Sequence, residues 1–333
     1  MNRHPLGHTA LEVSHLGYGC TQLTTLPDRK AAVRILEFAF SYGITHFDVA
    51  RAYGFGRAEG LLGEFLQGKR SRVTVATKFG IQPPTGWAGN RHVINTAKRL
   101  LQPFPWLLQR AKNRGSSMGT SGVFTPAAAV ASLEQSLREL RTDYVDIFFL
   151  HEATPSDAAN ESLIEALQAQ VALGKIRLLG VASGFEKFWG TALPLASAYQ
   201  VLQFDDNVVV GNLPKLPRTE PRALVVHSVF TRLDWLHAAA SRHPAIVNSF
   251  SSQMQRNLAD RNILGSMILQ YALASPADLV LFSTASPERV SGNVNQASAP
   301  DDPALLARFA DFVAALSECE RGASSPPHLE TAS

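Results

Sequence analysis

Short apolar runs alternate with longer amphipathic segments along most of the chain. The runs are almost continuously hydrophobic, which is typical of strands that are buried on both faces of a parallel sheet. Runs of this kind lie at residues 16–20, 44–50, 72–78, 144–151, 176–183, 199–204, 223–228 and 278–283. Eight buried strands separated by helices favour an α/β fold of the closed (β/α)8 TIM barrel type over a doubly wound open sheet.

The segments between the runs carry residues that start and stop helices. Asp28 can cap a first helix, and Gly43 can end it. Thr125 followed by Pro126 is typical of a helix start, and Gly174 of a helix end. We therefore predict helices over residues 28–42, 58–67, 126–140, 161–173, 185–198 and 257–273.

Two stretches interrupt the alternation. Residues 80–125 are far longer than a usual strand-to-helix connection, so we predict a long loop insertion after the third strand. Long loops at the carboxyl ends of barrel strands are usually functional, and we expect this one to cover the substrate site; a surface excursion without a role is the alternative. Residues 321–333 are predicted to be a disordered tail, which leaves residues 1–320 as a single barrel domain.

The charge and cysteine content exclude several classes of protein. The net charge of +3 and the pI of about 8.9 are too mild to indicate a nucleic-acid partner. Cys20 and Cys319 lie far apart in the sequence, which argues against a disulfide framework and fits a reducing compartment. No apolar segment reaches the length of about 18 residues that a membrane span needs. We therefore predict a cytoplasmic protein with no membrane or nucleic-acid partner, and we leave its oligomeric state open.

The stretch HFDVARAYGFGRAEGLLG, residues 46–63, contains glycines that resemble a dinucleotide-binding loop. A Rossmann fingerprint needs its glycines directly after the first strand and an acidic residue at the end of the next strand. Here the strand ends near Asp48, six residues before Gly54, and the next strand ends in Lys78 instead of an acid. We therefore reject the Rossmann alternative and interpret Gly54 and Gly56 as turn residues before a helix.

Four polar or ionisable residues lie at or just after the carboxyl ends of three strands, where barrel enzymes place their catalytic groups. They are Asp48, Tyr53, Lys78 and His151. Each has an ordinary structural explanation when taken alone, as an acceptor of backbone hydrogen bonds, a packing aromatic or a solvated strand end. Their coincidence on one face of one barrel predicts a catalytic site.

These residue types together suit the reduction of a carbonyl group. A carbonyl that accepts hydride needs a proton donor, and a phenol with a pKa of about 10 is a reluctant donor at neutral pH. The Lys78 ammonium is expected to stabilise the phenolate and so lower the pKa of Tyr53, while Asp48 holds the ammonium in place. His151 can hydrogen-bond the carbonyl oxygen and orient it.

The chain resembles the aldo-keto reductase family from about Leu6 to Asn293. The resemblance rests on long, ordered matches, namely LGHTALEVSHLGYGCTQ, YGITHFDVARAYGFGRAEGLLGEFL, VTVATKFG, LRELRTDYVDIFFLHE, GKIRLLGVAS and STASPERVSGN. It implies a (β/α)8 barrel that binds NAD(P)H without a Rossmann domain. The implied activity is NADP-dependent reduction of an aldehyde or ketone to an alcohol, or the reverse, by hydride transfer. The family's tetrad falls on Asp48, Tyr53, Lys78 and His151, with Tyr53 as general acid or base.

The resemblance also implies residues that contact the nicotinamide half of the cofactor. These are Gly19, Cys20, Thr21, Asp48, Ser183, Gln203, His227 and Ser228. Two of the positions depart from the family's pattern. Gly184 follows Ser183 where the family usually has Asn, and His227 stands where the family usually has a stacking Tyr. A histidine ring is planar and can stack, but its polarity and titration differ from those of a tyrosine.

The adenosine half of the cofactor is expected to lie against the segment after the last strand. By resemblance, Ser283, Thr284 and Arg289 contact the ribose phosphate, and Asn293 contacts the adenine. Arginine suits a 2′-phosphate because its fork can bind two oxygens. The prediction is therefore NADPH, with NADH as the alternative; an exposed arginine at a helix start, without a ligand, is the alternative for Arg289.

The remaining signals leave other functions open. His151 and Glu152 do not suggest a metal pair, because adjacent strand residues point to opposite faces, so we predict no metal site. A small-molecule carbonyl or alcohol is the expected substrate. A cofactor-binding regulatory subunit resembling potassium-channel β subunits is one alternative, and an isomerase or epimerase that uses bound nucleotide is another.

Overall fold

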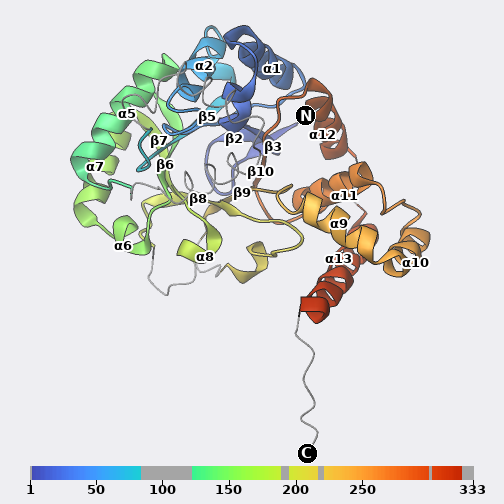
Figure 1. The fold of residues 1–333 in the computed structure, drawn as a ribbon. Coiled ribbons are helices and arrows are strands. Elements are labelled where there is room, and N and C mark those ends of the chain that lie inside the picture. The colour runs from blue at the N-terminus through green and yellow to red at the C-terminus, as the bar shows by residue number, and fades with distance from the viewer. Residues whose placement is uncertain (1, 84–121, 189–194, 217–220, 300–301, 325–333) are drawn as a thin grey trace, which may run out of the picture.

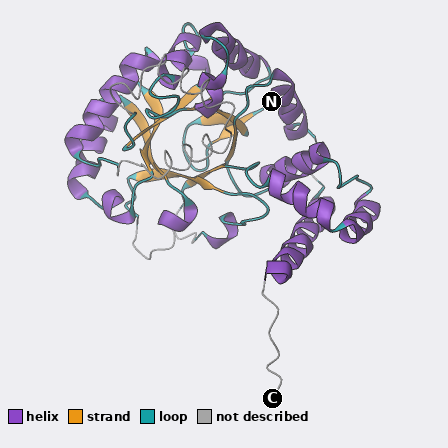
Figure 2. Ribbon diagram, viewed as in Figure 1, coloured by secondary structure: helices purple, strands orange, loops and turns teal. Residues whose placement is uncertain are grey.

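Eight parallel strands close into a barrel in the computed structural model, which describes residues 2–83, 122–188, 195–216, 221–299 and 302–324 (Figures 1 and 2). The strands are β3 (Leu16–Gly19), β4 (His46–Asp48), β5 (Thr74–Phe79), β6 (Val145–His151), β7 (Ile176–Ala182), β8 (Tyr199–Asp205), β9 (Ala223–His227) and β10 (Leu279–Phe282). They pair in sequence order, and β10 pairs with β3 to close the ring. All eight predicted strands and the predicted TIM barrel are confirmed.

Helices surround the ring of strands on the outside, as Figure 2 shows. They include α1 (Arg29–Ser41), α2 (Ala58–Phe65), α5 (Pro126–Leu140), α6 (Pro155–Ala158), α7 (Glu161–Ala172), α8 (Phe185–Phe188), α9 (Leu233–Arg242), α10 (Pro244–Met254), α11 (Arg261–Leu273), α12 (Pro287–Ala297) and α13 (Pro303–Ser324). Their apolar side chains join those of the strands in one large buried cluster, and α10 and α13 pack against each other and against α9 at one side of the barrel (Figure 1). This layer fixes the strand ends from outside.

The predicted helix boundaries are confirmed where the sequence supplies a cap. The side chains of Asp28 and Thr125 accept hydrogen bonds from backbone N–H groups in the first turns of α1 and α5. Gly43 and Gly174 follow the ends of α1 and α7 with φ angles of 89° and 73°, the left-handed conformation that glycine adopts at little cost.

Two predicted helices differ from the structure. The helix predicted over 185–198 is wrong at its end: residues 185–188 are helical, residues 195–198 are not, and 189–194 lie outside the described residues. The helix predicted from residue 257 begins at Arg261, because the Asp260 side chain caps its first turn. Helices α6, α9, α10, α12 and α13 are not among those predicted from the periodicity of the sequence.

A short hairpin that the sequence analysis missed lies at the amino end of the barrel. It pairs β1 (Arg3–Pro5) with β2 (Glu12–Ser14) in antiparallel fashion. Leu6 and Val13 are fully buried and belong to the cluster of apolar side chains inside the barrel. Gly7, between the two strands, has a φ of 55°, and a side chain there would meet the backbone of Ala223 at 2.9 Å. The hairpin therefore packs against the amino end of the barrel interior.

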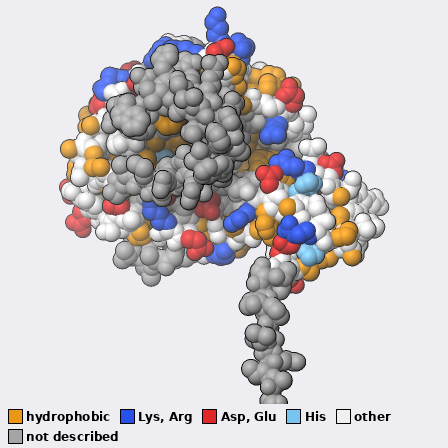
Figure 3. Space-filling model, in the orientation of Figure 1, with side chains coloured by type: hydrophobic (Ala, Val, Ile, Leu, Met, Phe, Trp, Pro, Cys, Tyr) orange, Lys and Arg blue, Asp and Glu red, His pale blue; other side chains and the backbone are white. Residues whose placement is uncertain are grey.

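Several predicted features lie wholly or partly beyond the described residues. Residues 84–121 of the predicted insertion and residues 325–333 of the predicted tail lie outside the described residues. Residues 321–324 of the predicted tail are helical, because α13 extends to Ser324. Cys20 is buried, Cys319 is exposed, and both are free thiols. The helices of the described residues are too short or too polar to cross a membrane. Acidic and basic side chains are mixed over the described surface in view (Figure 3).

Candidate active site

The four predicted catalytic residues come together in one cavity at the carboxyl end of the barrel. Asp48 ends β4, Lys78 is near the end of β5, His151 ends β6, and Tyr53 lies in the loop after β4. The cavity has a volume of about 550 Å³. Its lining residues are Gly19, Thr21, Gln22, Asp48, Tyr53, Lys78, His151, Glu152, Ala182, Gln203, His227, Ser228, Val229, Phe230, Thr231, Leu281, Phe282 and Ser283.

A buried ion pair between Lys78 and Asp48 lies at the base of the cavity. Their side chains are 2% and 4% exposed, and Lys78 Nζ donates a hydrogen bond to Asp48 Oδ1. The ammonium also donates to the carbonyl oxygen of Val49 at 3.2 Å. Burial alone lowers the pKa of Lys78, but Asp48 and Tyr53 together outweigh it and hold that pKa above its usual value. Lys78 therefore keeps its positive charge at neutral pH.

The phenol of Tyr53 is close to this ammonium. Lys78 Nζ lies 5.3 Å from the centre of the Tyr53 ring. Burial raises the pKa of Tyr53, and the nearby Lys78 only partly opposes that effect. Lys78 acts in the predicted direction, but the sequence-based expectation left out the desolvation of the phenol, so the pKa of Tyr53 lies above its usual value. Tyr53 carries its proton at neutral pH and is available as a donor.

His151 packs edge-on against Tyr53 and is electrically neutral. The two ring centres are 5.9 Å apart and the ring planes are 83° from parallel. Burial, with a further contribution from Lys78, lowers the pKa of His151 to about 3. Its Nδ1 atom is buried and has no hydrogen-bond partner among the described residues. A neutral imidazole at this place can hydrogen-bond a substrate oxygen without adding charge.

Gln203 connects the ion pair to the opposite side of the barrel. Its Nε2 donates to Asp48 Oδ2 at 3.1 Å, and its side chain is almost fully buried. Gln203 Oε1 is also buried and finds no partner in the described part of the chain. Buried polar atoms are nearly always paired, and Gln203 lines the cavity, so its unpaired oxygen indicates a place for a ligand donor.

Two residues at the cavity have backbone conformations that sequence analysis did not detect. Glu152 and Ser228 have φ angles of 59° and 62°, in the left-handed region that side chains other than glycine rarely adopt. Both follow a strand directly and line the cavity. Lys187 donates to the backbone oxygen of Glu152 and lies 3.4 Å from its carboxylate. Neither residue is glycine, so the sequence held no signal for these turns.

The residues expected around the nicotinamide fall into two groups. Those that line the cavity are Gly19, Thr21, Asp48, Gln203, His227 and Ser228. Cys20 and Ser183 are buried beside it, and their side chains donate to the backbone oxygens of Tyr18 and Ala153. The structure therefore brings six of these eight residues to the cavity.

The residues expected at the adenosine end lie along the segment that leaves β10. Ser283 lines the cavity and accepts a hydrogen bond from Thr21 at 2.9 Å. Thr284 is buried. Arg289 and Asn293 lie on α12, and the guanidinium of Arg289 is exposed. These two residues are four positions apart, so they share one face of the helix.

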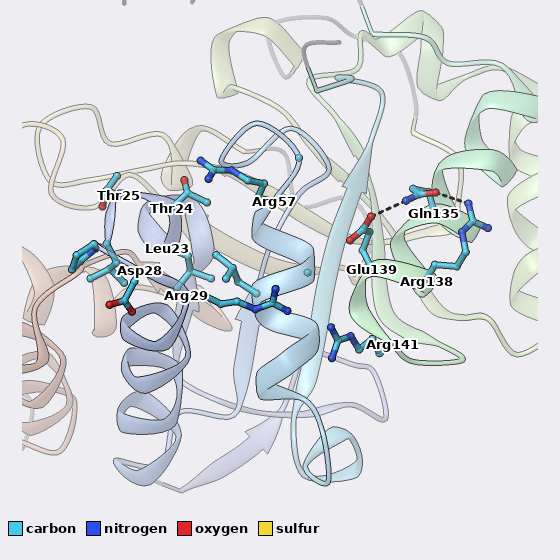
Figure 4. Close-up of a pocket in the computed structure, with 15 residues that line it drawn as sticks. Leu23, Thr24, Thr25, Asp28, Arg29, Arg57, Gln135, Arg138, Glu139 and Arg141 are labelled. Carbon is cyan, nitrogen blue, oxygen red and sulfur yellow. Dashed lines mark hydrogen bonds between the residues drawn. The ribbon is translucent and has the colours of Figure 1, made fainter. Parts of the chain in front are cut away.

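A larger cavity lies outside the barrel, between α1, α2 and α5 (Figure 4). It has a volume of about 960 Å³, and four arginines line it, namely Arg29, Arg57, Arg138 and Arg141. Glu139 accepts from Gln135, which accepts from Arg138 (Figure 4). None of the predicted catalytic residues lines this cavity. Among the described residues, no cluster of His, Cys, Asp and Glu could hold a metal ion.

The sequence can be compared with models of known protein families. The model described as "Aldo/keto reductase family" matches residues 15–189. Among curated proteins, "Uncharacterized oxidoreductase YqkF" of Bacillus subtilis is 30% identical over 183 residues, which cover 55% of this chain and 49% of that protein. The chain thus spans about half the length of the curated relatives it matches.

Solved structures share the fold over most of the chain. The holo form of "aldo-keto reductase AKR11C1" from Bacillus halodurans has a TM-score of 0.66 and 21% identity, covering 95% of this chain and 96% of that one. An aldo/keto reductase from Klebsiella pneumoniae, solved "in complex with NADP and acetate", has a TM-score of 0.62 and 20% identity, covering 92% of each chain. At these identities the similarity establishes the barrel fold.

Proposed function

The chain belongs to the aldo/keto reductase family, and from that premise we propose that it is an NADPH-dependent oxidoreductase. The proposed reaction is reduction of an aldehyde or ketone to an alcohol by hydride transfer, or the reverse, with Tyr53 as general acid or base. One observation carries the proposal: a protonated phenol, a buried ammonium–carboxylate pair and a neutral imidazole line one cavity at the carboxyl end of the barrel.

The proposed proton transfer starts from Tyr53. Because burial raises its pKa, the phenol is protonated at neutral pH and can donate to a carbonyl oxygen that becomes an alkoxide. Lys78 stays charged and stabilises the phenolate that remains. Asp48 fixes the ammonium through a buried ion pair. His151, neutral and packed at right angles to Tyr53, orients the substrate oxygen.

The cavity also offers groups that fit a nicotinamide. NADPH, when bound, supplies the hydride that the carbonyl carbon accepts. The buried and unpaired Gln203 Oε1 is an acceptor that suits the N–H groups of a carboxamide. His227 lines the same cavity, and burial lowers its pKa, so a neutral planar ring is available for stacking.

The choice of NADPH over NADH rests on α12. Arg289 is exposed near the start of this helix and forms no ion pair with any described residue. A guanidinium can bind two oxygens of a 2′-phosphate, which NADH lacks. Asn293 lies one helical turn further along, and in the proposed complex it contacts the adenine.

The proposal is tested by binding first and turnover second. Purified protein is titrated with NADPH and with NADH while the fluorescence of the nicotinamide is followed. It is then given a panel of aldehydes and ketones with NADPH, and a panel of alcohols with NADP⁺. We expect tighter binding of NADPH and oxidation of NADPH with at least one carbonyl. Failure to bind either nucleotide would overturn the proposal.

Two other outcomes would redirect it. NADPH binding with negligible turnover on the panel, together with a stable heteromeric complex, would indicate a cofactor-binding regulatory subunit. Product formation without net consumption of NADPH would indicate an isomerase or epimerase. The protonated Tyr53 beside a charged Lys78 favours the reductase over both.

A further inference from the structure

A second buried carboxylate lies directly behind the proposed catalytic residues, on the outside of the barrel. Glu59 is the second residue of α2, and its side chain is 1% exposed. Its Oε2 accepts a hydrogen bond from Arg51 Nη1 at 2.8 Å, and its Oε1 accepts one from Thr77 Oγ1 at 2.7 Å. Thr77 is fully buried. We call these three residues the Glu59 clamp.

The clamp joins the two segments that carry the proposed catalytic groups. Arg51 lies between Asp48 and Tyr53 in the loop after β4, and Thr77 precedes Lys78 on β5. Successive strand residues point to opposite faces of the sheet. Thr77 therefore faces α2, whereas Lys78 faces the cavity. Glu59 therefore holds the Tyr53 loop and the Lys78 strand from behind.

The Tyr53 loop needs such a restraint because its own backbone is weakly tied to the barrel. Gly54, Phe55 and Gly56 have consecutive φ angles of 58°, 60° and 83°, and Phe55 is exposed. The backbone of Val49 bonds to β5, but beyond it the described backbone hydrogen bonds of the loop run within the loop or to the start of α2. The charged clamp thus adds a side-chain link from the part of this loop beyond Val49 to β5.

We propose that Glu59 is a positioning residue: through Arg51 and Thr77 it fixes the Tyr53 hydroxyl relative to Lys78 Nζ. This inference rests on the proposed function of Tyr53 as proton donor. A misplacement of about 1 Å in a reacting group can lower a rate about 100-fold. We therefore expect the clamp to affect kcat. We expect no effect on cofactor affinity, because the proposed cofactor-binding segments are at β8, β9 and α12.

The test compares Glu59→Gln with Asp146→Asn. Each variant replaces one oxygen of a buried carboxylate that accepts from arginine, but Asp146 lies at the amino end of β6, away from the cavity. We expect both to lower the unfolding temperature. Glu59→Gln is expected to lower kcat roughly 10- to 100-fold and to shift the pH profile of kcat. NADPH affinity should stay within about twofold, and Asp146→Asn should keep kcat.

A conservative pair of variants separates positioning from general damage. Thr77→Val removes the hydroxyl that Glu59 accepts from, and Thr77→Ser keeps it. We expect Thr77→Val to lower kcat several-fold and Thr77→Ser to retain it. If Glu59→Gln does not fold, this pair carries the test. Full kcat in Glu59→Gln, or in Thr77→Val, would overturn the proposal, as would an equal loss of kcat in Asp146→Asn.

A readout that does not depend on turnover keeps this inference distinct from the proposed function. Hydrogen exchange of the backbone amides in residues 49–58 is followed by mass spectrometry in the wild type and both carboxylate variants. We expect about tenfold faster exchange of this segment in Glu59→Gln and no change there in Asp146→Asn. Unchanged exchange in Glu59→Gln would overturn the positioning role even if the wild type reduces no carbonyl.

Discussion

Two ionic clusters, each built on a buried carboxylate, lie at opposite ends of the barrel and differ in how completely their polar atoms are paired. At the amino end, Asp146 accepts from Arg70 at 2.7 Å, from Arg177 at 2.9 Å and from the backbone N–H of Val75 at 2.8 Å. Both guanidinium groups also lie over the ring of Tyr144, at 3.8 and 4.5 Å from its centre. Both carboxylate oxygens of this cluster are therefore used.

The cluster at the carboxyl end is incomplete by comparison. Asp48 is paired with Lys78 and Gln203, but Gln203 Oε1 and His151 Nδ1 are buried without partners in the described chain. Glu152 and Ser228, which border it, hold left-handed backbone conformations.

This difference in pairing indicates which cluster affects the stability of the fold and which one takes part in the proposed reaction. Breaking a fully paired buried cluster destabilises the fold, since loss of one partner leaves a buried charge uncompensated. Unpaired polar atoms and strained turns cost stability, and they persist where a ligand completes them. The amino-end cluster is thus expected to affect folding alone, and the carboxyl-end cluster to affect turnover more than folding.

The largest expected effect is on turnover, in Tyr53→Phe. Removing the phenolic hydroxyl removes the proposed proton donor, so we expect kcat for carbonyl reduction to fall roughly 10²- to 10⁴-fold. Steady-state kinetics with NADPH and an accepted aldehyde measure the loss. The control is the NADPH affinity and unfolding temperature of the variant, which should match the wild type; a variant with full kcat would show that Tyr53 is not the acid.

The amino-end cluster is expected to give the opposite pattern. Arg70→Met removes a donor that Asp146, Thr142 and two backbone oxygens accept from. We expect the free energy of unfolding to fall by about 3 kcal/mol, while kcat stays within about twofold. Urea unfolding and steady-state kinetics on the same preparation test both halves. A large loss of kcat at normal stability would remove the distinction between the two ends.

Acid is expected to destabilise the protein partly through a buried histidine at the amino end. Burial lowers the pKa of His46, at the start of β4, to about 4, below the usual value of about 6.5. Between these values the unfolded chain binds the proton and the folded one does not, so stability falls as the pH falls from about 6.5 towards 4. His46→Gln should reduce this fall by roughly 3 kcal/mol in urea unfolding at a series of pH values. An unchanged slope would contradict the assignment.

Gln203→Ala should weaken cofactor binding more than folding. Its Oε1 has no partner in the described chain, so the truncation loses one hydrogen bond, to Asp48, and relieves one unpaired atom. We expect the Kd for NADPH to rise about tenfold and the unfolding free energy to change by less than about 1 kcal/mol. Fluorescence titration and urea unfolding measure the two quantities. Unchanged affinity would place the carboxamide elsewhere.

The smallest expected effect is on cofactor binding, in a variant of the exposed Arg289 on α12. Arg289→Ala should weaken NADPH binding roughly fivefold and leave NADH binding unchanged, because an exposed ion pair contributes about 1 kcal/mol or less. Parallel titrations with the two nucleotides provide the measurement. Equal weakening of both would mean that Arg289 does not contact the 2′-phosphate.

The barrel could be predicted because its strands are buried on both faces and so appear as continuous apolar runs. The catalytic candidates could be predicted for a related reason: a charged or phenolic residue that ends such a run stands out, as Asp48 and Lys78 do. The β1–β2 hairpin could not be found, since three-residue strands carry too little pattern. Helices α9 and α10 follow one another at Pro244, and this break hid their periodicity.

Other parts of the site had weaker signals or none. Glu59 lies on the apolar face of α2, beside the buried Ala58 and Leu62, and a carboxylate at such a position could have been noticed. The left-handed turns at Glu152 and Ser228 depend on tertiary contacts, and so does the pKa of Tyr53. The charge of Lys78 can be read from the sequence, but the desolvation of the phenol, which is the larger effect, depends on the folded structure.

The central claim is that a carbonyl bound in the carboxyl-end cavity accepts hydride from NADPH and a proton from Tyr53. Its most direct test uses NADPH carrying deuterium at C4 of the nicotinamide, with mass spectrometry of the alcohol product. We predict that the wild type gives an alcohol with one deuterium on the former carbonyl carbon, from one of the two C4-labelled isomers. Tyr53→Phe should bind the nucleotide equally and give little product in the same time. An alcohol without deuterium, or equal product from Tyr53→Phe, would contradict the account.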